Sequence, residues 1–372
     1  MGGAVPPGEI LSGKRKKNST QRKNTADASV DLLRLLDIVA AFPRQTIGVI
    51  GDMVLDEFVS GEISRVSREA PVLILRHRKS EAYPGGAANA VNNLADLGAR
   101  VFPVGVVGDD EGGQRLLEYF RRKQVDTAGI VRAKEWATTI KTRYLAGWTH
   151  TTEQQVLRVD REPNGALPER IVEAIERKAK KAAGRANAVL VSDYGLGAAT
   201  PALVGKLRAK RIALDSRYRL LEYRGAGVTA ATPNEAEIEA AYQTRVGAGL
   251  AKLEELGGRA LRELGLDALV VTRGKDGMAI FEAQKTGSVR GDGGSAARHI
   301  PIYGSDEPVD VTGAGDTVIA VFTLALAAGA TCLEAAHLAN YAGGIVVMKR
   351  HTATVTRAEL TGVLRREATA QR

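Results

Sequence analysis

The sequence predicts an α/β fold, in which helices cover both faces of a doubly wound, mostly parallel sheet and a small β-sheet forms a lid. From residue 168 onward, apolar strands alternate with helices, which is the pattern of a parallel sheet buried on both faces. Strands expected within about 58–82 and 138–160 alternate polar and apolar residues instead, as is typical of a sheet with one exposed face. Aromatic residues make up 5% of the chain against 41 Gly, which favours an aliphatic core with many tight turns.

The first part of the chain supplies an extension and the first strands of both sheets. Residues 1–28 are rich in Gly, Pro, Ser, Lys and Asn and are expected to form a disordered extension, whereas residues 29–372 are expected to form one domain with its lid. Apolar residues at helical spacing predict a helix over 29–41. Short apolar or alternating runs, and small residues at turns, predict the elements that follow: strand 46–50, lid strand 72–76, a helix from Gly85 to 97, strand 100–107, and lid strands 138–146 and 155–159.

The second part of the chain alternates regularly. Each helix is indicated by apolar residues three or four positions apart, and each strand by a short apolar run between turn residues. The expected elements are helix 168–183, strand 187–192, helix 200–208, strands 211–214 and 228–231, helices 234–241 and 249–264, strands 267–272 and 277–281, and helices 314–329, 333–347 and 357–367.

Composition and charge exclude several classes of protein. Cys332 is the one cysteine, which excludes a disulfide framework and a four-cysteine zinc site and fits a reducing cytoplasm. The net charge is +9, and residues 1–29, with six basic and two acidic side chains, supply +4 of it. No apolar run approaches the roughly 20 residues that span a bilayer, and no apolar segment follows the basic residues as in a secretory signal. We therefore expect a cytoplasmic protein without a membrane partner.

The strongest motif for chemistry is Asp310–Thr317, which precedes a long apolar helix. The small residues Gly313, Ala314 and Gly315 let backbone N–H groups converge at the helix N-terminus, where the helix dipole favours an anion. A carboxylate such as that of Asp316 would repel the anion, so it is better explained as a base. This arrangement suits phosphoryl transfer to a hydroxyl. The alternative is a Gly-rich turn in which the acid caps the helix.

Three further motifs have both a functional and a structural interpretation. In Gly85–Asn89, small residues would admit a ligand and Asn89 would bind sugar hydroxyls, or the segment simply starts a helix. In Thr232–Glu237, Asn234 and Glu237 would lie near nucleotide phosphates and Mg²⁺, or they cap a helix that starts at a proline. The segment Val270–Gly277 is a strand, turn and strand whose plainer interpretation is a hairpin.

Other motifs are excluded. The Gly8–Lys14 segment has Walker-like spacing, but Arg15 stands where Ser or Thr is required and no strand precedes it. The five His show no metal-ligand spacing, and no Gly-x-Ser-x-Gly motif supports a serine hydrolase.

Together these motifs, in this order, resemble the ribokinase/PfkB family of carbohydrate kinases over roughly residues 45–365. Within that family the chain is most similar to the kinases of D-glycero-β-D-manno-heptose 7-phosphate, the kinase half of a bifunctional protein of lipopolysaccharide core biosynthesis. The run Ser64–Val72 is not typical of other sugar kinases and decides this subfamily. The other matching segments are Gly51–Asp56, Pro84–Asn89, Thr139–Tyr144, Arg158–Asp160, Ser192–Gly195, Thr232–Asn234 and Asp310–Thr317.

The resemblance implies a ribokinase-like fold and an ATP- and Mg²⁺-dependent kinase. It would phosphorylate the anomeric hydroxyl of the heptose 7-phosphate to the 1,7-bisphosphate, for ADP-heptose synthesis. A homodimer through the lid is implied as well, and a monovalent cation requirement is left open. The implied site residues are Asp56, Gly85, Gly86 and Asn89 for sugar hydroxyls, Asp316 as base, Asn234, Glu237, Thr272 and Gly274 facing ATP, with Glu237 reaching Mg²⁺ indirectly, and Asn340 beside the adenine.

A heptose 7-phosphate also needs a cation at the end of the sugar far from the reacting hydroxyl. Arg65 lies in the lid between Ser64 and Ser67, and an Arg can bond two phosphate oxygens at once. Arg65 is therefore the first candidate, followed by Arg68 and Arg143. The alternative is that Arg65 is a solvated lid residue.

The sequence departs from the family in places. Ser216-Arg217-Tyr218 stands where relatives have Pro-Lys-Gly, and residues 284–299 look like a loop insertion. No His-x-Gly-His motif is present, so we expect a monofunctional kinase. Three alternatives stay open: a PfkB-type kinase for another sugar, sugar phosphate or sugar acid; a binding protein that uses the fold without turnover; and a nucleic-acid binder. The last is disfavoured because the basic extension lacks interleaved aromatic residues.

Overall fold

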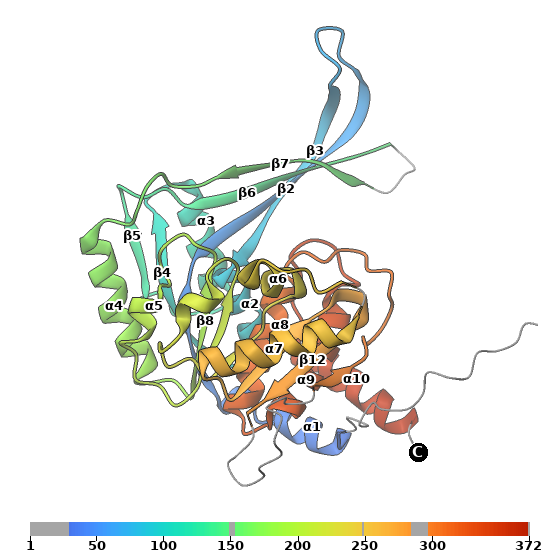
Figure 1. Ribbon diagram of the computed structural model, residues 1–372. Coiled ribbons are helices and arrows are strands. Elements are labelled where there is room, and N and C mark those ends of the chain that lie inside the picture. Colours follow the sequence, from blue (N-terminus) through green and yellow to red (C-terminus); the bar gives the residue numbers. More distant parts are fainter. Residues whose placement is uncertain (1–29, 149–152, 248, 284–296, 371–372) are drawn as a thin grey trace, which may run out of the picture.

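The computed structural model describes residues 30–148, 153–247, 249–283 and 297–370, shown in Figure 1. The expected extension 1–28 and most of the expected insertion 284–299 lie outside these residues. Within them a large sheet has the strand order β13-β12-β11-β10-β9-β8-β1-β4-β5, parallel from β11 to β5 and antiparallel at β12 and β13. Its strands are β1 (Thr46–Gly51), β4 (Arg100–Gly108), β5 (Ile130–Ala133), β8 (Ala188–Asp193), β9 (Ile212–Ser216), β10 (Ala230–Ala231), β11 (Ala268–Thr272), β12 (Met278–Glu282) and β13 (Arg298–Ile300).

Helices cover both faces of this sheet, as the alternating pattern predicts. Successive strand residues enter opposite cores: Val49 packs in one hydrophobic cluster and Ile50 in the other. The first core receives α1 (Leu32–Ala40), α2 (Ala87–Asp96), α3 (Glu111–Arg122), α8 (Ala314–Ala327), α9 (Cys332–Val346) and α10 (Arg357–Ala370). The second receives α4 (Glu169–Ala183), α5 (Pro201–Val204), α6 (Glu235–Tyr242) and α7 (Leu250–Leu264).

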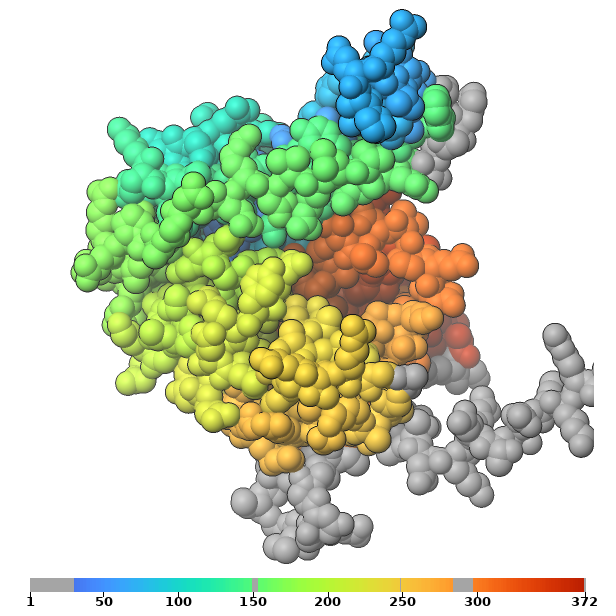
Figure 2. Space-filling view, turned by 45° about the horizontal axis from the view of Figure 1, so that its top comes forward, coloured from blue at the N-terminus to red at the C-terminus, as the bar shows by residue number. Residues whose placement is uncertain are grey.

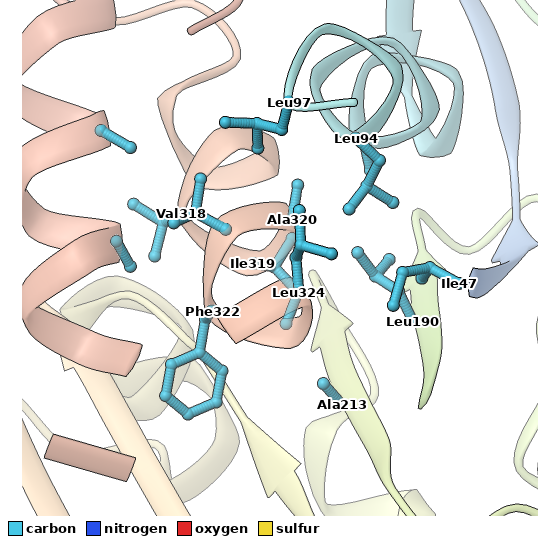
Figure 3. Packing of buried hydrophobic residues seen from close by; sticks show 14 of the residues in the cluster. Ile47, Leu94, Leu97, Leu190, Ala213, Val318, Ile319, Ala320, Phe322 and Leu324 are labelled. Atoms are coloured by element: carbon cyan, nitrogen blue, oxygen red, sulfur yellow. The ribbon is translucent and has the colours of Figure 1, made fainter. Parts of the chain in front are cut away.

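Helix α8 lies at the centre of the first core. Its residues Thr317–Leu326 are buried on every side, which a helix tolerates only when it is apolar all round. Figure 3 shows Ile319 and Leu324 against Leu190 and Ile47 of the sheet and against Leu94 of α2. Burial of each such side chain contributes roughly 1.5–3 kcal/mol, so the packing fixes the position at which α8 begins.

A second, four-stranded sheet forms the lid. Its strands are β2 (Met53–Val66), β3 (Leu73–Gly86), β6 (Thr139–Gly147) and β7 (Gln154–Arg161), in the order β3-β2-β6-β7. The far half of the β2–β3 hairpin projects away from the large sheet (Figure 1), and its tip stands apart from the rest of the surface in Figure 2. The strands expected within 58–82 and 138–160 are confirmed. β2 begins earlier than expected, at Met53, and β3 ends later, at Gly86, so both strands reach the large domain.

Some expectations about elements need correction. The helix expected over 200–208 covers only Pro201–Val204, and the strand expected over 228–231 only two residues. Pro233 does not start a helix, because Asn234 is the N-cap and α6 begins at Glu235. The sequence pattern missed the short strands β5 and β13 and the helix α3, whose first turn contains the helix-disfavouring residues Gly112 and Gly113. Among the described residues, no helix is long and apolar enough to cross a membrane.

Candidate active site

The N-terminus of α8 lies at the motif that the sequence identifies as a candidate anion site. Its N-cap, Gly313, has φ 78°, a left-handed conformation that favours glycine. A Cβ atom there would lie 2.5 Å from Nδ2 of Asn89. The N–H of Ala314 donates to the carbonyl of Val311 at 3.2 Å, and the following Gly315 is exposed. The helix therefore begins in a tight turn that leaves its first residues beside open space.

Asp310, the first acid of this motif, closes the loop that leads to α8. Its Oδ1 accepts a hydrogen bond from the N–H of Thr312 at 2.9 Å, and its Oδ2 accepts one from the N–H of His351, also at 2.9 Å. His351 has φ 63°, and the centroid of its ring lies 4.4 Å from the ring centroid of Phe58 on β2. Asp310 thus ties the loop to the C-terminal segment beneath the lid.

Asp316 lies in the first turn of α8 and is buried. Its Oδ2 accepts from Nδ2 of Asn89 at 2.9 Å, and its Oδ1 accepts from the hydroxyl of Tyr194 at 2.8 Å. Nδ2 of Asn93 donates to Oδ1 of Asn89 at 3.1 Å, which turns the Asn89 amide group toward the acid. Burial raises the pKa of Asp316 to about 7, although the two hydrogen bonds favour the ionised form.

The next acid, Asp56 on β2, is also buried and is held on both oxygens. Nη1 of Arg143 donates to its Oδ1 at 2.6 Å and the hydroxyl of Thr352 to its Oδ2 at 3.1 Å. A Cβ at position 85 would lie 2.5 Å from Asp56 Oδ2, so only glycine leaves room for this carboxylate. Gly86 follows with φ 55° as the N-cap of α2. The predicted sugar-site residues 56, 85, 86, 89 and 143 are therefore brought together beside Asp316.

Two cations lie on the ring of Tyr194. Nζ of Lys141, on lid strand β6, is 5.3 Å from the ring centroid, and Cζ of Arg217, just after β9, is 5.9 Å from it. Burial and the nearby charge of Arg217 lower the pKa of Lys141. The site thus combines positive groups from the lid and the body with the acids below them.

A cavity of about 290 Å³ opens on the other side of the α8 N-terminus. Thr272, Gly274 and Asn340 line it together with Ala314 and Gly315. The amide of Asn340 donates to the carbonyl of Pro301 at 2.9 Å, so it also fixes the cavity wall. The segment Val270–Gly277 is a β-hairpin, as its plainer interpretation predicts, with β11 and β12 antiparallel.

Asn234 and Glu237 form a reciprocal cap at the start of α6, which confirms the structural interpretation of their motif. Oδ1 of Asn234 accepts from the N–H of Glu237 at 2.8 Å, and Oε2 of Glu237 accepts from the N–H of Asn234 at 2.9 Å. A bridge between Asn234 and Thr272 places this turn at the edge of the 290 Å³ cavity. Burial, with the charges of Glu237 and Asp316, raises the pKa of the neighbouring Asp215. Among the described residues, no cluster of three His, Cys, Asp or Glu side chains could by itself hold a metal ion.

Neither Arg65 nor the next candidate, Arg68, which is exposed in the turn of the β2–β3 hairpin, lies at the site within this chain. Arg65 lies on β2 nine residues beyond Asp56, or about 30 Å along an extended strand, and it is exposed near the hairpin tip. A cavity of about 240 Å³ does lie next to Asp56, between the lid and the 309–312 loop. Arg143, Arg350 and His351 line it.

The sequence interpretation assigned no role to several residues that hold this site. Tyr194 and Asp52 each follow an apolar strand of the large sheet, at the edge where α/β proteins place ligands, and that position is a usable signal. Asn93 lies four residues after Asn89 on the same face of α2. The contact of Thr352 with Asp56 had no signal, because 296 positions separate them.

Comparisons with known proteins agree with this geometry. The family model described as pfkB family carbohydrate kinase matches residues 47–358. The chain is 40% identical over 321 residues to a Geobacter metallireducens protein named Bifunctional protein HldE, covering 84% of this chain and 62% of the relative. It is 40% identical over 337 residues to a protein of the same name from Mesorhizobium japonicum, covering 88% and 63%. The chain thus spans less than two thirds of the length of these relatives.

Solved structures show the same fold at low sequence identity. Arabidopsis thaliana ribokinase, complexed with ribose and ATP, has a TM-score of 0.63 at 18% identity and covers 86% of this chain and 98% of its own. Escherichia coli phosphofructokinase-2, in complex with substrates and products, has a TM-score of 0.68 at 16% identity and covers 87% and 99%. The ribokinase-like fold expected from the motifs is therefore confirmed.

Proposed function

The chain belongs to the pfkB family of carbohydrate kinases, and we propose that it phosphorylates the anomeric hydroxyl of D-glycero-D-manno-heptose 7-phosphate with ATP. The product is the 1,7-bisphosphate, for ADP-heptose synthesis. The 40% identity to proteins named Bifunctional protein HldE supports this acceptor, together with the subfamily run Ser64–Val72. The observation that carries the transfer chemistry is that the 308–315 segment separates two cavities, with Asp316 directly behind it.

In this proposal the sugar lies beside Asp56 and the triphosphate lies in the 290 Å³ cavity. Asp56, held by Arg143 and Thr352, accepts hydrogen bonds from sugar hydroxyls. Asp316 takes the proton of the attacking hydroxyl as the new bond to phosphorus forms. The backbone at Gly313, Ala314 and Gly315 stabilises charge on the transferred group through the helix terminus.

The acids near the cavity fit a divalent cation. Asp215 is half-buried near the end of β9, and its pKa is raised first by its removal from water and then by the neighbouring charges of Glu237 and Asp316. Mg²⁺ held near these acids would neutralise negative charge on the phosphates. Glu237, whose carboxylate already caps α6, would act on the ion through water, and Asn234 would hold the same turn.

The 240 Å³ cavity is the proposed site of the 7-phosphate. Arg350 is exposed there beside Arg143 and His351, and its guanidinium group can bond two phosphate oxygens at once, in a cavity that the acids Asp310 and Glu153 also line. Arg65 can serve this phosphate only from a second subunit, since it lies far from Asp56 in its own chain.

We further propose that the lid forms a homodimer. The strand registers place Val59, Tyr144, Leu157 and Val159 on the lid face opposite to Asp56 and Lys141. Leu157 is 55% and Val159 48% exposed, which is unusual for a pair of large apolar residues side by side. A second copy of this apolar sheet is the natural partner for such a face.

A panel of acceptors tests the proposed function. ADP formation is measured with heptose 7-phosphate, unphosphorylated heptose, fructose 6-phosphate, ribose and a sugar acid. We expect the highest kcat/KM with heptose 7-phosphate. A higher value with another acceptor would support the alternative of a PfkB-type kinase for that sugar. ATP binding in a calorimeter, without ADP formation on any acceptor, would favour a binding protein.

A further inference from the structure

Tyr194 contacts Asp316, the proposed base. It belongs to the segment Ser192–Gly195, which matches the family but to which the sequence analysis assigns no role. It directly follows β8, and its hydroxyl donates to Oδ1 of Asp316 at 2.8 Å. The other carboxylate oxygen is held by Asn89 at 2.9 Å. Each carboxylate oxygen has two lone pairs, so both hydrogen bonds leave acceptor capacity for a sugar hydroxyl. The two donors together fix the plane in which that capacity points.

The body of the protein fixes the position of Tyr194. The carboxylate of Asp52, at the end of β1, accepts hydrogen bonds from three N–H groups of the same loop: Tyr194 at 2.8 Å, Leu196 at 3.1 Å and Ala198 at 2.9 Å. Gly195 and Gly197 have φ 81° and 98°, which permit the tight loop that presents these N–H groups to one carboxylate. The loop is therefore anchored to the end of β1 in the large sheet.

We propose that Tyr194 is a positioning residue for phosphoryl transfer, whose hydroxyl orients Asp316 and favours its ionised form. This rests on the proposed role of Asp316 as base. In the step, the sugar O–H bond breaks and its proton goes to the Asp316 carboxylate. The sugar oxygen bonds to the γ-phosphorus, and the bond to ADP breaks with its electron pair remaining on ADP. Tyr194 keeps its own proton throughout.

The surroundings of Asp316 determine the direction of the effect. The charged and titratable groups that face it are Asp56 from β2, Lys141 from β6, Asp215 from β9 and Tyr194 itself. Burial and the neighbouring Asp316 raise the pKa of Tyr194 well above its ordinary value, so its hydroxyl remains a donor at working pH. Loss of this donor leaves the other groups in place and makes Asp316 easier to protonate.

The test compares Tyr194→Phe with Tyr223→Phe. Tyr223 is a matched control because its buried hydroxyl also donates to a carboxylate, Oδ2 of Asp193, at 2.9 Å. We expect the acid limb of kcat/KM in Tyr194→Phe to move up by about one to two pH units. Activity then falls about 5- to 50-fold at pH 7 and recovers toward pH 9. The limb of Tyr223→Phe stays at the wild-type position.

The pKa of Asp316 is also followed without any sugar, by carboxyl ¹³C NMR of aspartate-labelled protein, with Asp316→Asn to assign its signal. A higher Asp316 pKa in Tyr194→Phe supports the inference whatever the acceptor. An unmoved pKa, or an equal loss of activity at every pH, overturns it. Turnover that survives in Asp316→Asn instead defeats the proposed base. If Tyr194→Phe does not fold, 3-fluorotyrosine is placed at position 194, because its hydroxyl is a stronger hydrogen-bond donor. The acid limb of kcat/KM must then move to lower pH. An acid limb at the wild-type pH overturns the inference.

Discussion

Asp316, the proposed base, shows how the pKa of a buried carboxylate can be held near neutrality. Removal from water favours the protonated acid, whereas donors on both oxygens favour the ionised form, and the balance leaves its pKa at about 7. A general base is most effective when its pKa lies near the working pH. The geometry that produces this balance involves residues 89, 194 and 316, which the chain brings together from two helices and a loop.

Asp316→Asn tests the base directly. An amide keeps the shape of the carboxylate but cannot take the proton, so we expect kcat to fall by about 10²–10⁴-fold while ATP affinity stays within about twofold. In wild type, kcat/KM must fall as the pH decreases below about 7, since protonation removes the base. Steady-state rates and ATP titrations measure both effects, and near-normal turnover in the folded variant contradicts the assignment.

Arg350→Ala and Arg65→Ala separate the two sites proposed for the sugar phosphate. Arg350 lines the cavity next to Arg143, so its loss should raise KM for heptose 7-phosphate about tenfold or more and change KM for ATP little. Arg65 lies at the hairpin tip and should matter only if a partner subunit uses it. A normal sugar KM in Arg350→Ala and a raised one in Arg65→Ala would place the phosphate at the subunit interface.

At the residue scale the sequence predicted the types of side chain better than their partners. Gly313 and Asp316 are visible as a motif, because both lie at the start of one helix: Gly313 takes the left-handed conformation of the N-cap, and Asp316 lies in the first turn. Asn89 is predicted to bind sugar from its motif, but the motif does not show that its amide also donates to Asp316 and to the carbonyl of Gly313. That contact joins positions more than two hundred residues apart, and no local pattern encodes it.

At the element scale, the junction of β3 with α2 couples the lid to the site. β3 runs through Pro84, Gly85 and Gly86 directly into the helix that carries Asn89, while β2 carries Asp56 opposite. The alternating lid strands and the helix after Gly86 were predicted, since periodicity reports them. Helix α3 was not predicted, because its first turn contains Gly112 and Gly113. Glycine at 113 permits close packing on β4, since a Cβ there would lie 2.3 Å from the carbonyl oxygen of Gly108.

Gly85→Ala tests this junction. Its Cβ would lie 2.5 Å from Oδ2 and 2.7 Å from Cγ of Asp56, so the carboxylate must move. We expect KM for the sugar to rise by about tenfold or more with little change in KM for ATP. Gly258→Ala in α7 is the control, since its Cβ meets only Nη1 of Arg262 at 3.5 Å. Equal sugar KM values for the two variants would show that Asp56 does not hold the sugar.

At the scale of the whole molecule, the site follows from the topology of the sheet. Residues that follow or end parallel strands gather at one edge: Asp52 after β1, Tyr194 after β8, Asp215 in β9 and Asn234 after β10. Ligands of open α/β sheets bind at that edge, so strand order alone locates the site. The C-terminal segment then closes it from below through His351 and Thr352. The sequence predicts the strands, but not which loops meet across the sheet.

The outer lid face gives the last prediction, which concerns assembly. Leu157→Lys with Val159→Lys places two charges on this apolar face, and burying them against a second copy would cost far more than the contact returns. In sedimentation velocity we expect wild type to be a dimer and the double variant a monomer. Val172→Lys on α4, where valine is 40% exposed, should leave the dimer intact. β7 pairs with β6, the strand that carries Lys141 and Arg143. We therefore expect the monomer to have a raised KM for the sugar and a KM for ATP that changes less. A wild-type monomer at micromolar concentration, or a dimer that survives both charges, would exclude this face as the interface.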